Sequence, residues 1–507
     1  MAIDAQQALL LFLFLLLTWL LLKKRISKKQ NKNLPPSPPK LPFIGNLHQL
    51  GSLPHQSLWQ LSKKYGPVML LQLGNLPTVV ISSAEAAKAV MKTHDLDSCS
   101  RPPLQGAQRL TYNHQDLAFS PYGEYWREIR KICVLELFSV KRVQSYWSIR
   151  EEEITKLINS ISHHSSSSPS SPVDLTEKLF ALTASMIFRI AFGTSFEGSD
   201  LNHNRFNEVV QAAEATMGSF CAAEYFPYVG WIFDKLSGLH QRREKIFHEL
   251  DSFFQGVIDD HLNPGRKKNQ QDDIIDVFLK IVKEQTGFGA AILTETNIKA
   301  VLLNMFLGGV DTAAITMVWA MAELAKKPSL MKKAQDEVRN CIGNKGKVTE
   351  SDIEHLHYLK MIIKETFRLH PPAPLLLPRE SISHFKVNGY EIYPKTLIQV
   401  NAWAIGRDPA SWKDPEEFIP ERFMDSPIDI KGQHFELLPF GSGRRVCPAI
   451  YMGTTTVELG LANLLYSFDW ELPSGMKEED INMEESTGLS LTLNKRTPLK
   501  LVPKKHL

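Results

Sequence analysis

A long apolar segment constrains the fold more than any other feature of this chain. It runs from Leu293 to Pro328, and its middle is apolar on every side instead of along one stripe. A helix of this kind has to be covered by other elements all round. Thr294 or Thr296 can cap its start, and Pro328 ends it. The segment therefore predicts a long helix at the centre of a folded core.

The rest of the chain has helical patterns with a few short strand-like runs. V-M-L-L-Q-L and T-V-V-I-S-S predict a small hairpin around residues 74–77. The 507 residues are 43% hydrophobic and 22% charged, which excludes disorder as a description of the whole chain. The 58 basic and 55 acidic residues are interspersed, so nothing indicates nucleic-acid binding. We expect a mainly α fold with small β-sheets.

The amino terminus indicates a membrane anchor. Ala8 to Leu22 is an apolar run, and a basic cluster follows it at once. A cleaved signal peptide is the alternative, but it would carry basic residues before the run, where Asp4 is the only charge. Basic residues stay on the cytoplasmic side, so the body of the protein is expected in the cytosol.

The predicted organisation has three parts. A transmembrane anchor covers residues 1–22, and a basic, proline-rich hinge covers 23–46. The dense prolines of the hinge favour a stiff, extended spacer. Residues 47–507 are expected to form a single domain.

The central segment also carries an unusual polar group. Gly308 and Gly309 lie in mid-helix, where each costs about 1 kcal/mol relative to alanine, and Asp311 and Thr312 follow. Close helix packing would explain the glycines, and a buried salt bridge would explain Asp311. Taken together, the residues indicate a loosened helix that carries a proton relay.

The five cysteines are scattered and include no C-x-x-C pair, which argues against both a disulfide framework and a zinc site. Cys447 stands apart, in the segment P-F-G-S-G-R-R-V-C-P-A-I. Pro448 suits the first position of a helix, and a helix amino terminus stabilises a thiolate. Such a thiolate can serve as an axial ligand of haem iron. A redox-sensing or nucleophilic cysteine is the alternative, but it would need a general base. The Gly441-x-Gly443 pair lacks the rest of a nucleotide fingerprint.

Four segments, in chain order, resemble motifs of the cytochrome P-450 (haem-thiolate) monooxygenases. Their residues are most similar to those of the plant microsomal A-type group. They are Gly308-Gly309-x-Asp311-Thr312, Glu365-x-x-Arg368, Pro420-Glu421-Arg422-Phe423 and Phe440-x-x-Gly443-x-Arg445-x-Cys447. The resemblance covers almost the whole chain. It implies a cytochrome P-450 fold with haem b (iron protoporphyrin IX) between the long central helix and the cysteine loop.

The resemblance also implies a role for each motif residue. Cys447 would be the axial ligand of the haem iron, and Asp311 and Thr312 would supply protons for oxygen activation. The other cofactor-binding residues implied are Trp126, Arg130, Arg379, Phe440, Gly443 and Arg445, and the structural ion network implied is Glu365, Arg368 and Arg422. Ala449 stands where the family usually has glycine, and its methyl group would crowd the haem slightly without abolishing binding.

The implied activity inserts one oxygen atom of O2 into a small lipophilic plant specialised metabolite, such as a terpenoid, phenylpropanoid, alkaloid or amino-acid derivative. Electrons would come from NADPH through a separate cytochrome P-450 reductase at the endoplasmic reticulum membrane. The substrate-contact regions implied are 102–120, 206–222, 301–311, 373–377 and 487–489. Aldoxime dehydration or oxidation, rearrangement or ring formation at the same haem is the alternative, and a non-catalytic haem protein is a third.

Overall fold

The computed structural model describes residues 33–193, 203–266, 272–284, 293–488 and 490–506. The predicted anchor, 1–22, and the first part of the hinge, 23–32, lie outside these residues. The described part of the hinge packs on the body, where Leu70 N donates to Pro36 O at 2.8 Å. Within the described residues, one helix is long and apolar enough to cross a membrane, and it is the mostly buried α15 (Glu295–Lys326).

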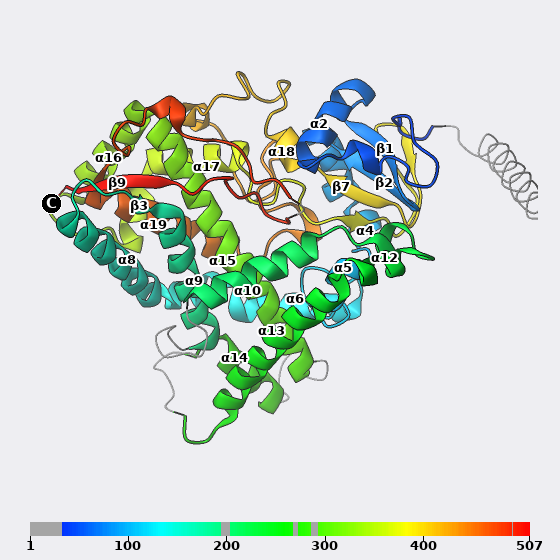
Figure 1. The fold of residues 1–507 in the computed structure, drawn as a ribbon, viewed down its shortest axis with the longest axis horizontal. Helices are drawn as coiled ribbons and strands as arrows, with labels where there is room; N and C mark the ends of the chain where they lie inside the picture. The colour runs from blue at the N-terminus through cyan, green and yellow to red at the C-terminus, as the bar shows by residue number, and fades with distance from the viewer. Residues whose placement is uncertain (1–32, 194–202, 267–271, 285–292, 489, 507) are drawn as a thin grey trace, which may run out of the picture.

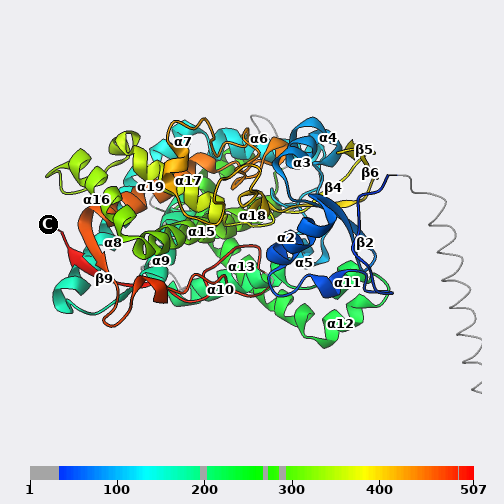
Figure 2. The ribbon, with the colours of Figure 1, turned by 90° about the horizontal axis from the view of Figure 1, so that it is seen from above.

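Helix α15 lies at the centre of the molecule (Figures 1 and 2). Thr294 and Asn297 form a capping box at its start, and it ends at Lys326, before Pro328 opens the next helix. It packs against α9 (Leu175–Phe192), α10 (His203–Gly218), α13 (Leu239–Leu262), α16 (Pro328–Ile342), α17 (His357–Leu369) and α19 (Ile450–Ser467). The predicted central helix is therefore confirmed, with Thr294 as its cap.

Shorter helices surround this core. They are α2 (Pro54–Tyr65), α3 (Ala84–Lys88), α4 (Asp95–Ser98), α5 (Gln105–Gln108), α6 (Glu124–Ile132), α7 (Val140–Ser145), α8 (Trp147–Ser167), α11 (Ala222–Tyr225), α12 (Gly230–Leu236), α14 (Ile274–Glu284) and α18 (Ala402–Ile405), with 3-10 turns η5 (Pro420–Phe423) and η6 (Gly443–Arg445).

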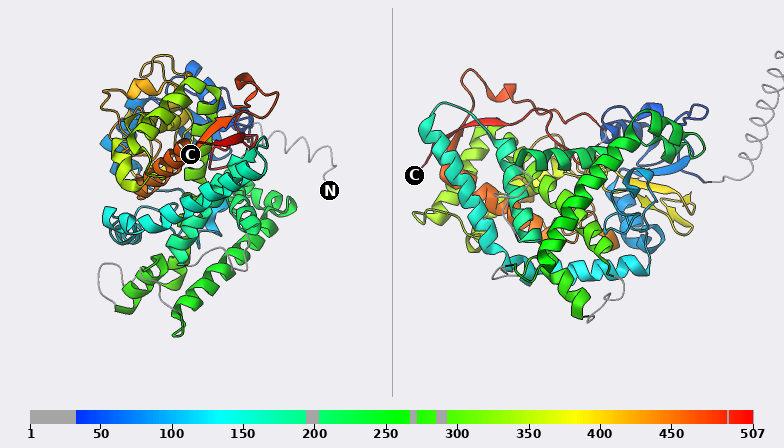
Figure 3. Two further views of the ribbon diagram at one scale, coloured as in Figure 1. Left: turned by 90° about the vertical axis from the view of Figure 1, so that its left-hand side faces the viewer. Right: turned by 60° about the horizontal axis from the view of Figure 1, so that its bottom comes forward.

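The described strands form small sheets at the two ends of the longest axis (Figure 1). One sheet has the order β1 (Val68–Leu73), β2 (Leu76–Ile81), β7 (Leu397–Val400) and β4 (Arg379–Glu380). The predicted hairpin is its β1–β2 pair, which joins Val68 to Ile81. At the other end, β9 (Lys500–Lys505) pairs with β3 (Val173–Asp174) and β8 (Phe468–Glu471), close to α8 (Figure 3). Strands β5 (Phe385–Val387) and β6 (Tyr390–Ile392) form a separate ribbon.

Two helices begin later than the sequence predicts. The Ser120-Pro121 pair favours a helix that starts at Pro121, but α6 begins at Glu124 after Gly123. The backbone at Ser120 is bonded to the cysteine loop instead, because Ser120 O accepts a hydrogen bond from Arg445 Nη2 at 2.7 Å. Pro448 was expected at the first helical position, but Pro448 and Ala449 form a turn, and α19 begins at Ile450.

Candidate active site

A cavity of about 370 Å³ lies between α15 and the loop that precedes α19. Gly308, Gly309 and Thr312 line it from α15, and Phe440 and Cys447 line it from the loop. These residues come from two motifs that are far apart in the sequence, and the fold places them on opposite walls of one cavity.

The two glycines of α15 are needed for different reasons. A Cβ atom at Gly309 would lie 2.5 Å from Ile187 Cδ1 on α9, so this glycine permits close helix packing. A Cβ atom at Gly308 would meet nothing within 4 Å. Gly308 therefore leaves open space on the cavity wall, whereas Gly309 fits the packing explanation.

The loop around Cys447 has a backbone that requires glycine. Gly443 has a φ of +70°, and a Cβ atom there would lie 2.3 Å from Met91 O. Cys447 N donates to Phe440 O at 2.9 Å, which closes the loop. Burial raises the pKa of the Cys447 thiol, while the backbone N–H of Ala449 and the Arg130 guanidinium lower it. A metal ion with net positive charge would favour the thiolate further.

Three arginines line the cavity near this loop, of which Arg101 and Arg379 are buried and Arg445 is half-buried. Arg445 donates from Nε to Cys99 O and from Nη2 to Ser120 O, but its buried Nη1 has no partner among the described residues. Arg379 pairs with Asp95 at 2.8 Å. Arg101 donates to the carbonyl oxygens of Ala118, Leu377 and Pro378. All three line the cavity.

These arginines carry more positive charge than the described carboxylates balance. Burial lowers the pKa of Arg445 to about 9, and it lowers the pKa of Arg101 as well. The neighbouring guanidiniums add to the effect on Arg101. A buried cationic cluster with an unpaired N–H is suited to bind carboxylate groups. Haem carries two propionates, so the cluster and Cys447 together fit a haem group.

Sequence reasoning did not identify Arg101 as part of this cluster. No local pattern marks it, because its place is set by carbonyl groups from two distant loops. Only the folded structure shows that it lies beside Arg379 and Arg445.

Trp126 and Arg130 lie on one face of α6, as their spacing predicts. Trp126 Nε1 already donates to Leu117 O at 3.0 Å, and its ring lies under the Arg445 guanidinium. Arg130 Nη2 donates to Val446 O at 2.6 Å, next to Cys447. In this structure Trp126 supports Arg445, and Arg130 supports the cysteine loop.

The two predicted relay residues face different ways. Thr312 lines the cavity, and its Oγ1 donates to Gly308 O at 2.7 Å. The Asp311 side chain is buried beside Glu214 of α10 and is not part of the cavity wall. No described salt-bridge partner accompanies Asp311, so the buried salt bridge considered from the sequence is not found among the described residues.

Glu365, Arg368 and Arg422 meet in a buried ion network away from the cavity. Arg368 binds both carboxylate oxygens of Glu365 at 2.7 Å, and Arg422 Nε adds a bond of 2.9 Å. The remaining N–H groups of Arg368 donate to carbonyl oxygens of Gly406, Pro415 and Glu417. The network joins α17 to η5.

The cavity wall includes parts of most of the predicted substrate-contact regions. Leu117, Met217, Val301 and Leu377 are examples from four of them. The last implied region, 487–489, includes residue 489, which lies outside the described residues, and the described wall next to it is formed by Leu491 and Thr492. Sequence reasoning also missed α9, which contributes Thr183, Met186 and Ile187.

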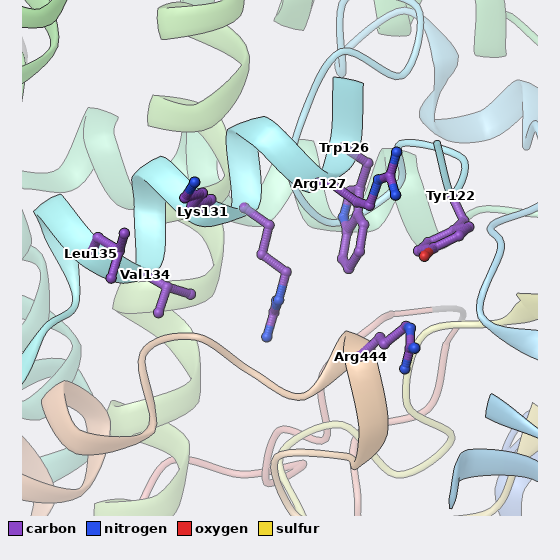
Figure 4. A pocket seen from close by; sticks show the side chains of 8 residues that line it. Tyr122, Trp126, Arg127, Lys131, Val134, Leu135 and Arg444 are labelled. Atoms are coloured by element: carbon purple, nitrogen blue, oxygen red, sulfur yellow. The ribbon is translucent and has the colours of Figure 1, made fainter. Parts of the chain in front are cut away.

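A second cavity opens to solvent along α6 (Figure 4). Four basic side chains line it, together with the aromatic and aliphatic side chains of Tyr122, Trp126, Val134 and Leu135. The basic residues are Arg127, Arg130, Lys131 and Arg444. No acidic side chain lines this second cavity, so the surface between α6 and Arg444 is basic.

Comparison with known proteins gives consistent matches over the whole chain. The family model described as Cytochrome P450 matches residues 35–501. Cytochrome P450 71B37 of Arabidopsis thaliana is 57% identical over 98% of both chains, and Cytochrome P450 71B9 is 58% identical over 93%. A zebra fish cytochrome P450 structure, with abiraterone, superposes with a TM-score of 0.73 at 24% identity, covering 89% of this chain and 99% of that one. The predicted mainly helical fold is thereby confirmed.

Proposed function

The chain belongs to the cytochrome P450 family of monooxygenases, and from that premise we propose that it oxidises a small lipophilic plant specialised metabolite with electrons from NADPH. The observation that carries the proposal is the single cavity that joins Cys447, Thr312 and the buried arginines. Haem bound there supplies the activation of dioxygen, which no protein side chain can perform.

Cys447 would hold the haem iron, and the arginines would hold the propionates. Arg445 Nη1 is the donor that still lacks a partner among the described residues. Arg379 and Arg101 add charge on the same side of the cavity. Phe440 belongs to the loop itself and meets the Phe367 ring edge-on, with the ring centres 5.3 Å apart, so an aromatic pair adjoins Cys447 on this side of the cavity.

Thr312 and Asp311 would hold and move protons on the opposite wall. The Thr312 hydroxyl faces the cavity, and its bond to Gly308 O leaves both oxygen lone pairs available to accept a proton donor. Gly308 leaves room next to it. Water that enters the cavity can hydrogen-bond to this hydroxyl, and so deliver a proton at a fixed position.

The cavity wall favours a small apolar substrate. Its side chains are mainly aliphatic or aromatic, with a small number of polar groups, which is the usual composition of a site for lipophilic molecules. Terpenoids, phenylpropanoids, alkaloids and amino-acid derivatives of this size all satisfy that requirement.

The basic cavity along α6 supports an acidic redox partner. Three of its basic residues, Arg127, Arg130 and Lys131, lie on α6, and Arg444 faces them from η6, three residues before Cys447 (Figure 4). Charge complementarity steers association between proteins. We therefore assign this surface to the NADPH–cytochrome P450 reductase that supplies electrons.

An exposed apolar surface supports attachment to a membrane. Tyr228, Leu236 and Phe43 are 86%, 80% and 69% exposed. They come from adjoining segments, since Gly45 forms a bridge with Leu73 of β1, Asn75 N donates to Tyr225 O at 2.8 Å, and α12 packs against α11. This end of the molecule would rest on the endoplasmic reticulum membrane, next to the predicted anchor, with the catalytic domain in the cytosol.

The test is a reconstituted reaction. Full-length protein, a plant reductase and NADPH are incubated under labelled dioxygen with a panel of lipophilic plant metabolites. The proposal expects one labelled oxygen atom in the product and no product without NADPH. Product formed without NADPH would support dehydration or rearrangement instead.

A further inference from the structure

Two buried carboxyl groups meet beside the cavity, and the roles assigned above use only one of them. Asp311 lies on α15, and Glu214 lies on α10, which packs against it. Their side chains are 1% and 5% exposed. The two carboxyl groups hydrogen-bond to each other. Thr492 Oγ1 also donates to Glu214 Oε2 at 2.9 Å.

This contact requires a proton. An ionised carboxylate only accepts hydrogen bonds, so two carboxyl groups bond to each other only when one of them is protonated. Asp311 Oδ1 is buried and receives no bond from the donor groups of the described residues. Two carboxyl groups in one dry site therefore share at least one proton.

No described cation neutralises the pair. Burial raises the pKa of Glu214 to about 10, with Asp311 as the next cause, and burial also raises the pKa of Asp311. Three charged side chains on the surrounding elements are paired with other charged groups, namely Lys299 with Asp251, Arg109 with Glu244 and Arg189 with Glu153. Arg243 of α13 donates to Gln105 O and Cys221 Sγ. The shared proton therefore takes the place of a counter-ion.

Glu214 also connects Asp311 to the cavity. Glu214, Thr492 and Thr312 line the cavity, whereas Asp311 does not. A proton that leaves the pair can thus be replaced at Glu214 from water in the cavity. Without Glu214, Asp311 would have no described group with which to share a proton.

We propose that Glu214 is a positioning residue for oxygen activation, which keeps a proton on its pair with Asp311 and fixes the Asp311 side chain against α10. The proposal rests on the monooxygenase function proposed above. It makes α10 part of the proton supply, in addition to α15.

The test compares Glu214→Gln with Glu208→Gln in the full-length, haem-loaded protein. Glutamine keeps the shape of Glu214 but cannot share a carboxyl proton, and Glu208 is an exposed acid on the same helix. The first readout is the infrared C=O band of a buried protonated carboxyl, in water and in deuterium oxide. We expect this band to shift or weaken in Glu214→Gln and in Asp311→Asn, because each variant removes one partner of the shared proton, and to stay unchanged in Glu208→Gln.

The second readout is the pH profile of NADPH consumption and peroxide release with reductase present. Wild-type protein should be insensitive to pH across the neutral range, because the pair stays protonated. In Glu214→Gln the rate of NADPH consumption should fall as pH rises, because Asp311 then has no second carboxyl group with which to share its proton. At the alkaline end the loss should be about tenfold, less than the roughly hundredfold of a direct proton donor.

The outcomes separate this proposal from the proposed function. If wild-type protein binds no haem, or does not consume NADPH with reductase present, the proposed monooxygenase function is contradicted. A working wild-type protein whose infrared band and pH profile are unchanged in Glu214→Gln overturns the inference. If Glu214→Gln does not fold, Thr492→Val provides the test. This variant loses the hydrogen bond from Thr492 to Glu214, so the infrared band must shift if Glu214 carries the proton.

Discussion

The guanidinium carbon of Arg445 lies 3.9 Å from the centre of the Trp126 ring. This contact holds Arg445, which lines the cavity and whose buried Nη1 has no partner among the described residues. A cation over an indole ring contributes about 0.5–2 kcal/mol. The pair therefore links α6 to the cysteine loop and orients the donor that would bind a haem propionate.

Trp126 should matter for haem retention through this contact. Trp126→Ala removes the surface under Arg445, so we expect a lower haem content per protein. Trp126→Phe keeps a ring there and loses only the bond to Leu117 O, so it should retain more haem. Haem absorbance relative to protein after gel filtration measures this order. Equal haem content in the two variants would contradict it.

Glu365 should be indispensable for folding. Its loss leaves the buried guanidinium of Arg368 without its carboxylate, which costs about 3–5 kcal/mol. Glu365→Ala is therefore expected to give little folded protein. The control is Arg496→Ala, which removes an exposed ion pair with Glu484 and should cost less than about 1 kcal/mol. Thermal unfolding of both variants provides the comparison.

Alanine should have opposite effects at the two neighbouring glycines. Gly308→Ala meets open space and improves helix propensity by about 1 kcal/mol, so the haem-free protein should unfold at a higher temperature. Gly309→Ala brings a methyl group against Ile187 and should lower stability by about 1–3 kcal/mol. Ile187→Val in the same chain should restore part of the loss. The same sign at both glycines would show that the packing assignment is wrong.

Asp116 should make stability depend on pH in mild acid. Burial raises its pKa to about 6, above the ordinary value of 3.8, although Asn304 and backbone N–H groups oppose the shift. The folded state therefore binds the proton more tightly than the unfolded state. This contribution is complete below about pH 4 and is lost as pH rises through about 6.

The variant Asp116→Asn isolates this contribution, which amounts to at most about 3 kcal/mol. Its unfolding free energy should lack the decline between these pH values that wild-type protein shows. Denaturant titrations at a series of pH values measure the difference. Parallel pH profiles for the two proteins would exclude Asp116 as the group responsible.

Sequence patterns predicted the features that depend on neighbouring residues. The uniform apolar character of 293–328 predicted α15, and two strand-like runs flanking residues 74–77 predicted the β1–β2 hairpin. The motif around Cys447 could be recognised from the sequence because its glycines and arginines belong to one short loop. Sequence spacing also placed Glu365 and Arg368 on one face of α17.

Features that depend on contacts between residues far apart in the sequence could not be predicted from local sequence patterns. Glu214 has no distinctive local pattern, and its importance comes from Asp311 and Thr492, which belong to other elements. Arg101 is placed by carbonyl groups of two loops. The late start of α6 has the same origin, because Ser120 O is bonded to Arg445.

The central claim is that the Cys447 thiolate binds haem iron in the cavity opposite Thr312. The most direct measurement is the absorbance spectrum of the reduced protein with carbon monoxide, for wild-type protein and for Cys447→His. We predict the long-wavelength band typical of thiolate-ligated haem for wild-type protein, and its loss in Cys447→His with haem still bound. A band that persists without the cysteine would contradict the claim.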